Sequence, residues 1–329
     1  MVLYWYLLGA KVNETKEGGC GHPMGTEDVS DRYRGVDTWP DHEILAGLYE
    51  AQLTAVVAVG PALPAIAGAA RTISETLEAG DGRLIFVGAG ASGRLSVQDG
   101  VELTPTYSFP SNRILYLLAG GDAALTGSVE GAEDDAETGA DLIAEHAVAA
   151  ADVVVGVAAS GTTRFTVSAV EAARARGAVT IGMANNRDAP LLKASQHAIL
   201  LDTGAEPVAG STRMKAGTAQ KVALNLLTTL AMIRLGGVHD GMMVDVQMSN
   251  AKLRDRGRRM VAQIADCDPA AADDALERTG NRVKAAVLVA RGLDVQSADT
   301  LLAEAGGRLR QALERLDQAP AGTATNATS

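Results

Sequence analysis

One stretch of the sequence decides the fold class: residues 84–94, which read LIFVGAGASGR. Its first four residues are uniformly apolar, as expected for a strand that is buried on both faces of a sheet. The glycines that follow allow a sharp turn and a close approach to a ligand, and the start of the next helix presents free N–H groups to an anion. The stretch therefore predicts a buried strand, a tight loop and an anion-binding helix start.

Four more short apolar runs follow along the chain, at residues 114–118, 153–157, 179–183 and 198–201. Helical patterns lie between and after them, notably at residues 163–175 and 214–235, and both patterns end at glycine. Two further helices, about residues 41–59 and 61–79, precede the first strand. This alternation predicts an α/β fold with a doubly wound, mainly parallel five-stranded sheet.

The last part of the chain shows helical patterns without strands, and it contains a repeat. Residues 275–284 echo residues 301–310, and each copy reads as a helix, a glycine turn and a second helix. Two such copies bury each other's apolar faces, which predicts a small C-terminal helical module. The expected organisation is a disordered N-terminal extension at 1–26, a catalytic domain at 27–255, the helical module at 256–318 and a disordered tail at 319–329.

The composition excludes several classes of function. A net charge of −11 and an aromatic content of 3% argue against a nucleic-acid partner, because that role needs a basic field and stacking side chains. The apolar first residues lack a basic region and are too short to span a bilayer, so no membrane role is expected. Two cysteines, Cys20 and Cys267, indicate a reducing, cytoplasmic compartment. Five histidines without ligand spacing predict no metal site.

Two more loops rich in glycine, serine and threonine stand at helix starts. The loop AASGTT (residues 158–163) follows the third strand, and the loop GSTRMKAGT (residues 210–218) opens the longest helix. Because the carboxyl ends of parallel strands meet at one sheet edge, all three loops should converge there. Serine hydroxyls at these places serve equally as helix N-caps, and Lys215 could instead pair with a surface acid. The candidate binding residues are Gly90, Ser92, Gly93, Ser160, Gly161, Thr162, Thr163, Ser211, Thr212 and Lys215.

The first loop also fits the pattern Gly-x-Gly-x-x-Gly of dinucleotide-binding proteins. That class needs an acidic residue about twenty positions further on, at the end of the second strand, to bind the ribose. The nearest candidate, Asp122, lies 29 residues after Gly93. The hydroxyl-rich second and third loops have no place in such a site either. A nicotinamide cofactor is therefore disfavoured, and no cofactor is expected.

Several segments together resemble the N-acetylmuramic acid 6-phosphate etherase family. They are GAGASGRL (88–95), VELTPT (101–106), VEGAEDD (129–135), AASGTT (158–163), GSTRMKAGTAQK (210–221) and MVDVQMSNAKLRDR (243–256). The similarity runs from about residue 26 to residue 316. The first motif alone would indicate only the wider superfamily of sugar isomerase (SIS) domains, whereas the combination is specific.

The resemblance implies a cofactor-free lyase of cell-wall recycling. Such an enzyme removes the D-lactyl ether from C3 of N-acetylmuramic acid 6-phosphate and leaves N-acetylglucosamine 6-phosphate and D-lactate. Glu102 matches the glutamate that protonates the leaving oxygen and later activates water, and Glu133 matches the one that removes the C2 proton. A homodimer with sites near the subunit interface is implied as well.

Two carboxyl groups suit this chemistry on physical grounds too. Opening of the sugar ring exposes an aldehyde at C1, which acidifies the C2–H bond, so one carboxylate acts as the base while the departing oxygen needs a proton. Burial raises a carboxyl pKa, so we expect the acid in the drier place. Without the resemblance, Glu102 reads as a helix-end or salt-bridging residue, and Glu133 as part of the first turn of a solvated helix.

Two departures from the family pattern bear on the substrate. Thr162-Thr163-Arg164 stands where the family commonly has Arg-Thr-Pro, and residues 104–107 (TPTY) replace Pro-Pro-Thr-Phe. Two alternatives stay open beside the etherase: a non-catalytic sugar-phosphate sensor like the glucokinase regulatory protein, and a phosphosugar aldose–ketose isomerase. Release of D-lactate separates the etherase from both.

Overall fold

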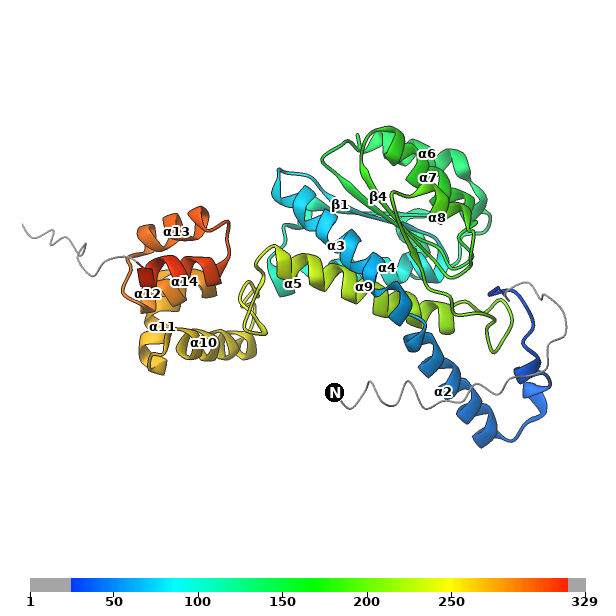
Figure 1. The fold of residues 1–329 in the computed structure, drawn as a ribbon, viewed down its shortest axis with the longest axis horizontal. Coiled ribbons are helices and arrows are strands. Elements are labelled where there is room, and N and C mark those ends of the chain that lie inside the picture. The colour runs from blue at the N-terminus through cyan, green and yellow to red at the C-terminus, as the bar shows by residue number, and fades with distance from the viewer. Residues whose placement is uncertain (1–24, 319–329) are drawn as a thin grey trace, which may run out of the picture.

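A five-stranded parallel sheet forms the centre of the computed structural model, which describes residues 25–318 (Figure 1). The strands are β1 Leu84–Gly88, β2 Ile114–Leu118, β3 Val153–Val157, β4 Val179–Ala184 and β5 His197–Leu200. Their spatial order is β2-β1-β3-β4-β5, with every neighbouring pair parallel. The predicted doubly wound sheet is thus confirmed, and each predicted strand lies within one residue of the observed one.

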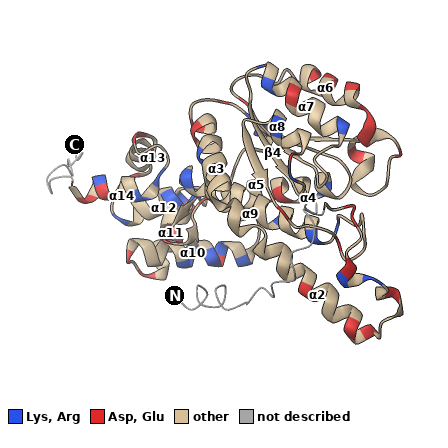
Figure 2. Ribbon diagram, turned by 45° about the vertical axis from the view of Figure 1, so that its right-hand side comes forward, with Lys and Arg blue, Asp and Glu red and all other residues tan. Residues whose placement is uncertain are grey.

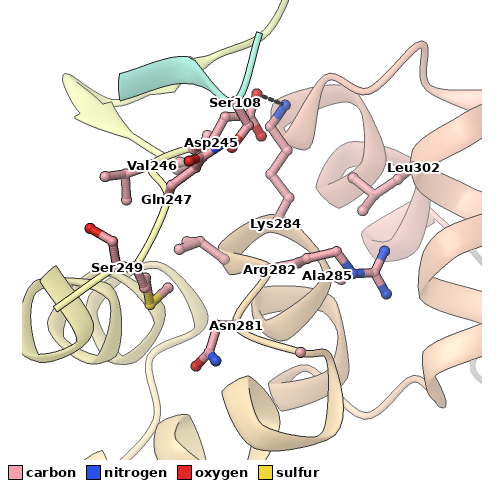
Figure 3. Close-up of a pocket in the computed structure, with 14 residues that line it drawn as sticks. Ser108, Asp245, Val246, Gln247, Ser249, Asn281, Arg282, Lys284, Ala285 and Leu302 are labelled. Carbon is pink, nitrogen blue, oxygen red and sulfur yellow. Dashed lines mark hydrogen bonds and ion pairs between the residues drawn. The ribbon is translucent and has the colours of Figure 1, made fainter. Parts of the chain in front are cut away.

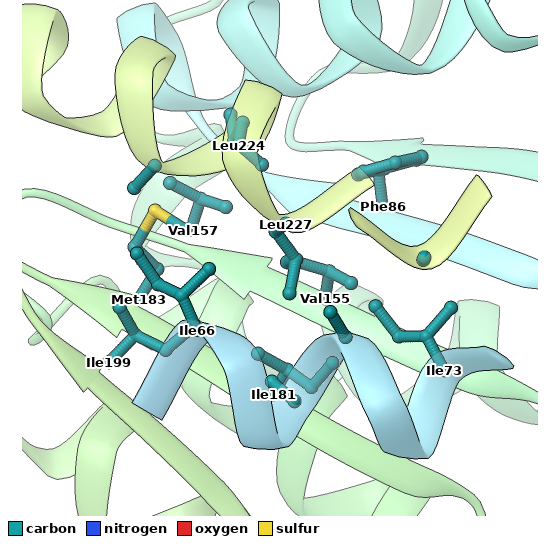
Figure 4. Packing of buried hydrophobic residues seen from close by; sticks show 14 of the residues in the cluster. Ile66, Ile73, Phe86, Val155, Val157, Ile181, Met183, Ile199, Leu224 and Leu227 are labelled. Atoms are coloured by element: carbon teal, nitrogen blue, oxygen red, sulfur yellow. The ribbon is translucent and has the colours of Figure 1, made fainter. Parts of the chain in front are cut away.

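Four helices cover one face of this sheet, and the larger of the sheet's two hydrophobic cores lies between them and the strands. They are α2 Asp41–Val57, α3 Leu63–Glu78, α4 Gly90–Val101 and α9 Lys215–Arg234. Figure 4 shows Ile66 and Ile73 of α3 and Leu224 of α9 packed over alternate strand residues such as Val155 and Ile181. All of these side chains are essentially inaccessible to solvent, so hydrophobic burial fixes α3 and α9 on the sheet.

The opposite face is covered by α6 Ala136–Glu145, α7 Arg164–Ala175 and α8 Pro190–Ala194, which lie above the sheet in Figure 1. Strand residues that point away from α3 and α9, such as Ile85 and Val154, pack here against Ile143 of α6, Phe165 of α7 and Leu191 of α8. Burial on both faces explains why the strands read as continuous apolar runs.

The C-terminal helices form a separate core beside the sheet domain. They are α10 Ala251–Ala265, α11 Pro269–Arg278, α12 Val283–Ala290, α13 Val295–Glu304 and α14 Leu309–Gln318. The predicted repeat is observed as the pairs α11–α12 and α13–α14, each joined by a glycine turn. The chain reaches them from α9 through a small β6–β7 hairpin, Val238–His239 and Met242–Met243. The segment after the hairpin contacts the short helix α5 Leu103–Tyr107, where Gln247 N donates to the Pro105 carbonyl at 3.0 Å.

We propose boundaries for the sheet domain that differ from the expected ones. The second core begins with Val244, and α10 runs across residue 255, so we propose that the helical module starts near residue 244. At the other end Thr26 is fully buried and belongs to the domain. The rest of the proposed extension, residues 1–24, and the tail from 319 lie outside the described residues.

A buried carboxylate connects α4 to α9 within the sheet domain. Asp99 of α4 is almost inaccessible, and its two oxygens accept hydrogen bonds from Lys221 Nζ at 3.1 Å and from Thr228 Oγ1 at 2.8 Å, both on α9. Asn225 donates to the same carboxylate. Because Lys221 is half-buried and Thr228 is buried, removal of the carboxylate would leave these donors without an acceptor.

We therefore expect Asp99→Ala to destabilise the chain by about 2–4 kcal/mol, since an unsatisfied buried donor and a broken buried ion pair both cost free energy. Urea unfolding followed by circular dichroism would show a lower midpoint at an unchanged slope. Asp122→Ala, at an exposed position without a hydrogen bond among the described residues, is the control and should change stability by less than about 0.5 kcal/mol. Equal midpoints for the two variants would contradict a structural role of Asp99.

Candidate active site

The three predicted loops meet at one cavity of about 400 Å³ at the carboxyl edge of the sheet. They contribute their glycines, backbone and hydroxyl groups to its wall, together with two acidic segments. The lining residues that the sequence predicted are Gly90, Ser92, Glu133, Ser160, Thr162, Thr163 and Thr212. The remaining predicted binding residues, Gly93, Gly161, Ser211 and Lys215, do not line this cavity.

Gly88 and Gly93 give the first loop its shape, and no other residue could replace them. A Cβ atom on Gly93 would lie 2.9 Å from the carbonyl carbon of Gly88, so α4 can begin this close to β1 only with glycine at both places. Gly90 has a positive φ of 51°, and the space around its missing Cβ is open. No side chain caps the start of α4, which leaves its first N–H groups available to an anion in the cavity.

The second loop repeats this arrangement at the start of α7. Ser160 Oγ accepts hydrogen bonds from Thr162 N at 3.2 Å and from Thr162 Oγ1 at 3.0 Å, which orders the loop around its hydroxyl groups. Gly161 has a φ of 68°, and a Cβ there would meet Ala189 Cβ at 2.4 Å, so its role is close packing beneath the cavity. Thr163 precedes α7 without capping it, so this second helix start is open too.

The third loop supplies Gly210 and Thr212 to the cavity, but Lys215 turns away from it. Lys215 Nζ donates to the Ala205 carbonyl at 2.8 Å. The buried Glu206 carboxylate accepts the N–H groups of Lys215 at 2.8 Å and of Ala216 at 2.9 Å, and it thereby caps α9. Burial lowers the pKa of the Lys215 ammonium, which the nearby Glu206 opposes. In this chain Lys215 fixes the start of α9.

The two predicted catalytic glutamates lie at opposite ends of α4. Glu133 lies at the rim of the cavity on a short 3-10 helix, Ala132–Asp134. Glu102 follows the last residue of α4, and Gly90 of the cavity is the first, so the helix places Glu102 about 18 Å from Gly90 along its axis at 1.5 Å per residue. Both glutamates are exposed. In a single chain, therefore, Glu102 lies far from the cavity start at Gly90 and lacks the drier surroundings expected for the acid.

Asp134, the neighbour of Glu133, also lines the cavity, and a second acidic residue outside the predicted set is Glu27. It is held there by its neighbour Thr26, whose N–H donates to Asn186 Oδ1 at 3.0 Å and whose carbonyl accepts the N–H of Gly210 at 3.1 Å. These contacts join segments that are 160 residues or more apart, so no local pattern announces them. A carboxylate here suits a sugar hydroxyl or amide donor, because it repels an anion.

A second cavity, of about 620 Å³, lies between residues 244–249 and the turn from α11 to α12 (Figure 3). Its charged groups satisfy each other: Lys284 Nζ donates to Asp245 Oδ2 at 2.5 Å and to the Gly307 carbonyl at 2.8 Å. Burial raises the pKa of the Asp245 carboxyl, and the Lys284 ammonium acts against this rise. The Lys284–Asp245 pair holds the helical module to the segment that precedes it. This cavity shares no lining residue with the cavity at the sheet edge.

The geometry at the sheet edge suits an anionic, hydroxyl-bearing ligand. Two uncapped helix starts and several hydroxyl groups can hold a phosphate, and the flanking carboxylates can accept hydroxyl protons or remove a proton from carbon. Within residues 25–318 no group of three or more histidine, cysteine or acidic side chains is placed to hold a metal ion.

Comparison with known proteins shows relatives over most of the chain. Residues 65–174 match the family model of the glucokinase regulatory protein N-terminal SIS domain, and residues 135–230 match the SIS domain. The N-acetylmuramic acid 6-phosphate etherase of Deinococcus radiodurans is 47% identical over 88% of this chain and 95% of its own length. That of Streptomyces avermitilis is 43% identical over 88% and 93%. A phosphoheptose isomerase structure from Francisella tularensis superposes with a TM-score of 0.42 at 18% identity, over 60% of this chain and 98% of its own.

The second loop provides a direct test of the cavity. Ser160→Ala removes the acceptor of both Thr162 donors as well as one hydroxyl of the wall, so we expect a hexose 6-phosphate to bind about 5- to 20-fold more weakly, equivalent to about 1–2 kcal/mol. Isothermal titration calorimetry measures the change. Ser111→Ala, on an exposed turn before β2, should leave the affinity unchanged. Equal binding by the Ser160 variant would remove this loop from the ligand site.

Proposed function

The chain belongs to the N-acetylmuramic acid 6-phosphate etherase family, and we propose that it cleaves the D-lactyl ether of N-acetylmuramic acid 6-phosphate to N-acetylglucosamine 6-phosphate and D-lactate. The observation that carries the proposal is the convergence of two uncapped helix starts, hydroxyl groups and Glu133 on one cavity. In a chain of net charge −11, an anion must be held by such local donors.

The phosphate would be bound mainly by neutral donors. Thr162 lines the cavity at the position where the family commonly has arginine. A hydroxyl there offers one hydrogen bond in place of a fixed positive charge, so the backbone N–H groups at the starts of α4 and α7 supply the electrostatic attraction. The open-chain sugar then extends from this phosphate toward the acidic rim.

The reaction follows from a base at C2 and an acid at C3. Glu133 takes the C2 proton, the C1 aldehyde stabilises the resulting enolate, and its electron pair forms the C2–C3 double bond as the C3–O bond breaks. Glu102 gives its proton to the lactate oxygen. Water then adds to C3 with loss of a proton to Glu102, and C2 regains its proton from Glu133. The sum is the uptake of one water and the release of lactate.

These roles require a second copy of the chain. Glu102 is about 18 Å from the first turn of α4 in its own chain, whereas an acid must lie within hydrogen-bond reach of the leaving oxygen. In a homodimer, Glu102 of one subunit could face the cavity of the other and so lie within reach of the leaving oxygen. The same contact would cover Glu102, which is exposed in the single chain, and would shield it from water.

We propose a cytoplasmic enzyme without nucleic-acid or membrane partners, in keeping with its acidic charge and its phosphorylated substrate. The sensor alternative retains one supporting observation, the match of residues 65–174 to the glucokinase regulatory protein model. Incubation of the pure protein with N-acetylmuramic acid 6-phosphate decides between them. Release of D-lactate supports the etherase, binding without lactate supports the sensor, and a ketose product supports an isomerase.

An isotope-exchange experiment should distinguish the roles of the two glutamates. Glu133→Gln should abolish exchange of the C2 hydrogen with deuterated water, because the base is gone. Glu102→Gln should stop lactate release and leave C2 exchange measurable, because loss of the acid blocks only the later bond cleavage. Proton NMR in deuterated buffer reads out both steps. Undiminished exchange in the Glu133 variant would exclude it as the base, and lactate release by the Glu102 variant would exclude that acid.

Mixing the two inactive variants tests whether the site is shared. A heterodimer of Glu102→Gln and Glu133→Gln chains contains one site with both glutamates and one with neither. Random assortment makes half of the dimers heterodimers, so co-expressed chains should recover about a quarter of wild-type lactate release. Each variant alone is the control. No recovery in a mixture that contains heterodimers by mass spectrometry would place both glutamates in one chain's site.

A further inference from the structure

The cavity at the sheet edge contains a carboxylate that the proposed reaction steps do not use. Glu27 lines this cavity, together with Glu133 and Asp134 of the short helix Ala132–Asp134. In the proposed steps, Glu133 is the base at C2 and Glu102 is the acid at C3. An unused carboxylate weakens the binding of an anion in the same cavity by charge repulsion, and such a conflict is typical of a functional residue.

Contacts between distant segments fix the backbone at Glu27. Its neighbour Thr26 is fully buried, and Asn186 binds Thr26 twice. Asn186 Oδ1 accepts the Thr26 N–H at 3.0 Å, and Asn186 Nδ2 donates to Thr26 Oγ1 at 3.2 Å. Asn186 follows β4 by two residues, so the anchor belongs to the sheet edge itself. Glu27 therefore presents an exposed side chain to the cavity from a fixed backbone position.

Gly210 of the third loop leaves the space that this carboxylate occupies. Gly210 has a φ of 72°, and a Cβ atom there would lie 2.9 Å from Glu27 Oε2. The Gly210 N–H donates to the Thr26 carbonyl at 3.1 Å, which holds the loop and the glutamate together. Glu133, in contrast, lies beside Gly90 of the first loop, with which it lines a neighbouring cavity of about 300 Å³. The two carboxylates thus reach the ligand from different loops.

The surroundings of Glu27 leave its carboxylate able to accept a proton. Among residues 25–318, no lysine, arginine or histidine lines this cavity. The most basic helix, α10 with one lysine and four arginines, belongs to the C-terminal module (Figure 2). Glu27 Oε1 accepts one long hydrogen bond, at 3.4 Å from Thr26 Oγ1. The remaining acceptor positions of the carboxylate are available to a hydroxyl group of the ligand.

The proposed reaction contains a proton transfer that neither Glu133 nor Glu102 makes. A hexosamine 6-phosphate is mainly a closed ring in water, with C1 bonded to the hydroxyl oxygen O1 and to the ring oxygen O5. Elimination needs the C1 aldehyde of the open chain, because the aldehyde acidifies the C2–H bond. Opening of the ring removes a proton from O1 and adds one to O5. Since both oxygens are bonded to C1, one carboxylate within hydrogen-bond reach of C1 can serve both.

We propose that Glu27 opens the sugar ring, an inference that rests on the proposed function. The Glu27 carboxylate takes the O1 proton, the C1=O double bond forms as the C1–O5 bond breaks, and O5 then receives the same proton from Glu27. The carboxylate is regenerated, so the step needs no other reactant, and its reverse closes the ring of the product. Because C1 can turn before the ring closes, the chain also interconverts the α and β anomers of a hexosamine 6-phosphate.

Asp134 is the competing residue for this role, because it lines the same cavity. It directly follows Glu133 on a short 3-10 helix. Consecutive side chains of such a helix point about 120° apart, so Asp134 points away from a sugar carbon that Glu133 faces. Glu27 approaches from the third loop and has no such restriction. The geometry therefore favours Glu27 for C1 while Glu133 acts at C2.

Anomer exchange tests the proposal independently of lactate release. Proton NMR exchange spectroscopy on the equilibrium mixture of N-acetylglucosamine 6-phosphate anomers measures the rate of their interconversion. The full wild-type chain should accelerate this exchange in proportion to its concentration. Glu27→Gln should lower the acceleration at least about 100-fold, because an amide cannot carry the proton from O1 to O5. The matched control is Asp28→Asn, whose side-chain oxygen can still accept the Gly25 N–H, and it should keep the wild-type rate.

Calorimetry with the same sugar phosphate separates chemistry from binding. Glu27→Gln should bind it within about fivefold of the wild-type affinity, because the amide oxygen accepts the same hydroxyl. An affinity loss that accounts for the whole loss of exchange would make Glu27 a binding residue only and overturn the proposal. So would a wild type without acceleration, a Glu27→Gln variant that keeps it, or an equal loss in Asp28→Asn. Loss of exchange in Asp134→Asn but not in Glu27→Gln would assign the step to Asp134 instead.

Lactate release from N-acetylmuramic acid 6-phosphate gives a second readout. Glu27→Gln should cleave only sugar that has opened without catalysis, so its rate of lactate release should stop rising as more enzyme is added. A rate that stays proportional to enzyme concentration, as in an enzyme that is merely weakened, would contradict the role of Glu27. The proposed function fails separately: a wild type that interconverts anomers but releases no lactate refutes the etherase and leaves ring opening by Glu27 standing.

Discussion

The close approach of β1 and α4 at Gly88 and Gly93 is the constraint on which the rest of the site depends. It allows α4 to start directly above the sheet edge, so the free N–H groups of its first turn face the cavity. The parallel register then brings the start of α7 to the same edge. We propose that a chain with a strongly negative net charge binds an anion in this way, because the helix dipoles supply the positive potential that side-chain cations do not.

The second determinant is the length of α4 and α9. Both helices begin at the cavity and run along the sheet, so whatever follows them is carried to the other end of the domain. Glu102 follows α4, and the helical module, which follows α9, is fixed to the segment before it through the Lys284–Asp245 pair. In the single chain the cavity therefore lies at one end of the sheet domain, and Glu102, the proposed acid, lies at the other.

The homodimer that we propose would resolve this separation, because Glu102 of one subunit could then face the cavity of the other. One two-fold interface would in this way complete two active sites.

The sequence by itself determined the sheet, its flanking helices and the three ligand loops, because burial on both faces leaves an apolar period and tight turns need glycine, and both are local signals. Through the family segments it also predicts Glu133 and Glu102 as the catalytic residues. Only the tertiary structure showed that Lys215 fixes the start of α9, that Glu27 enters the cavity through Thr26 and Asn186, and that α4 separates the glutamates. Those facts depend on contacts between residues far apart in the chain and on the direction of whole helices, which no local pattern encodes.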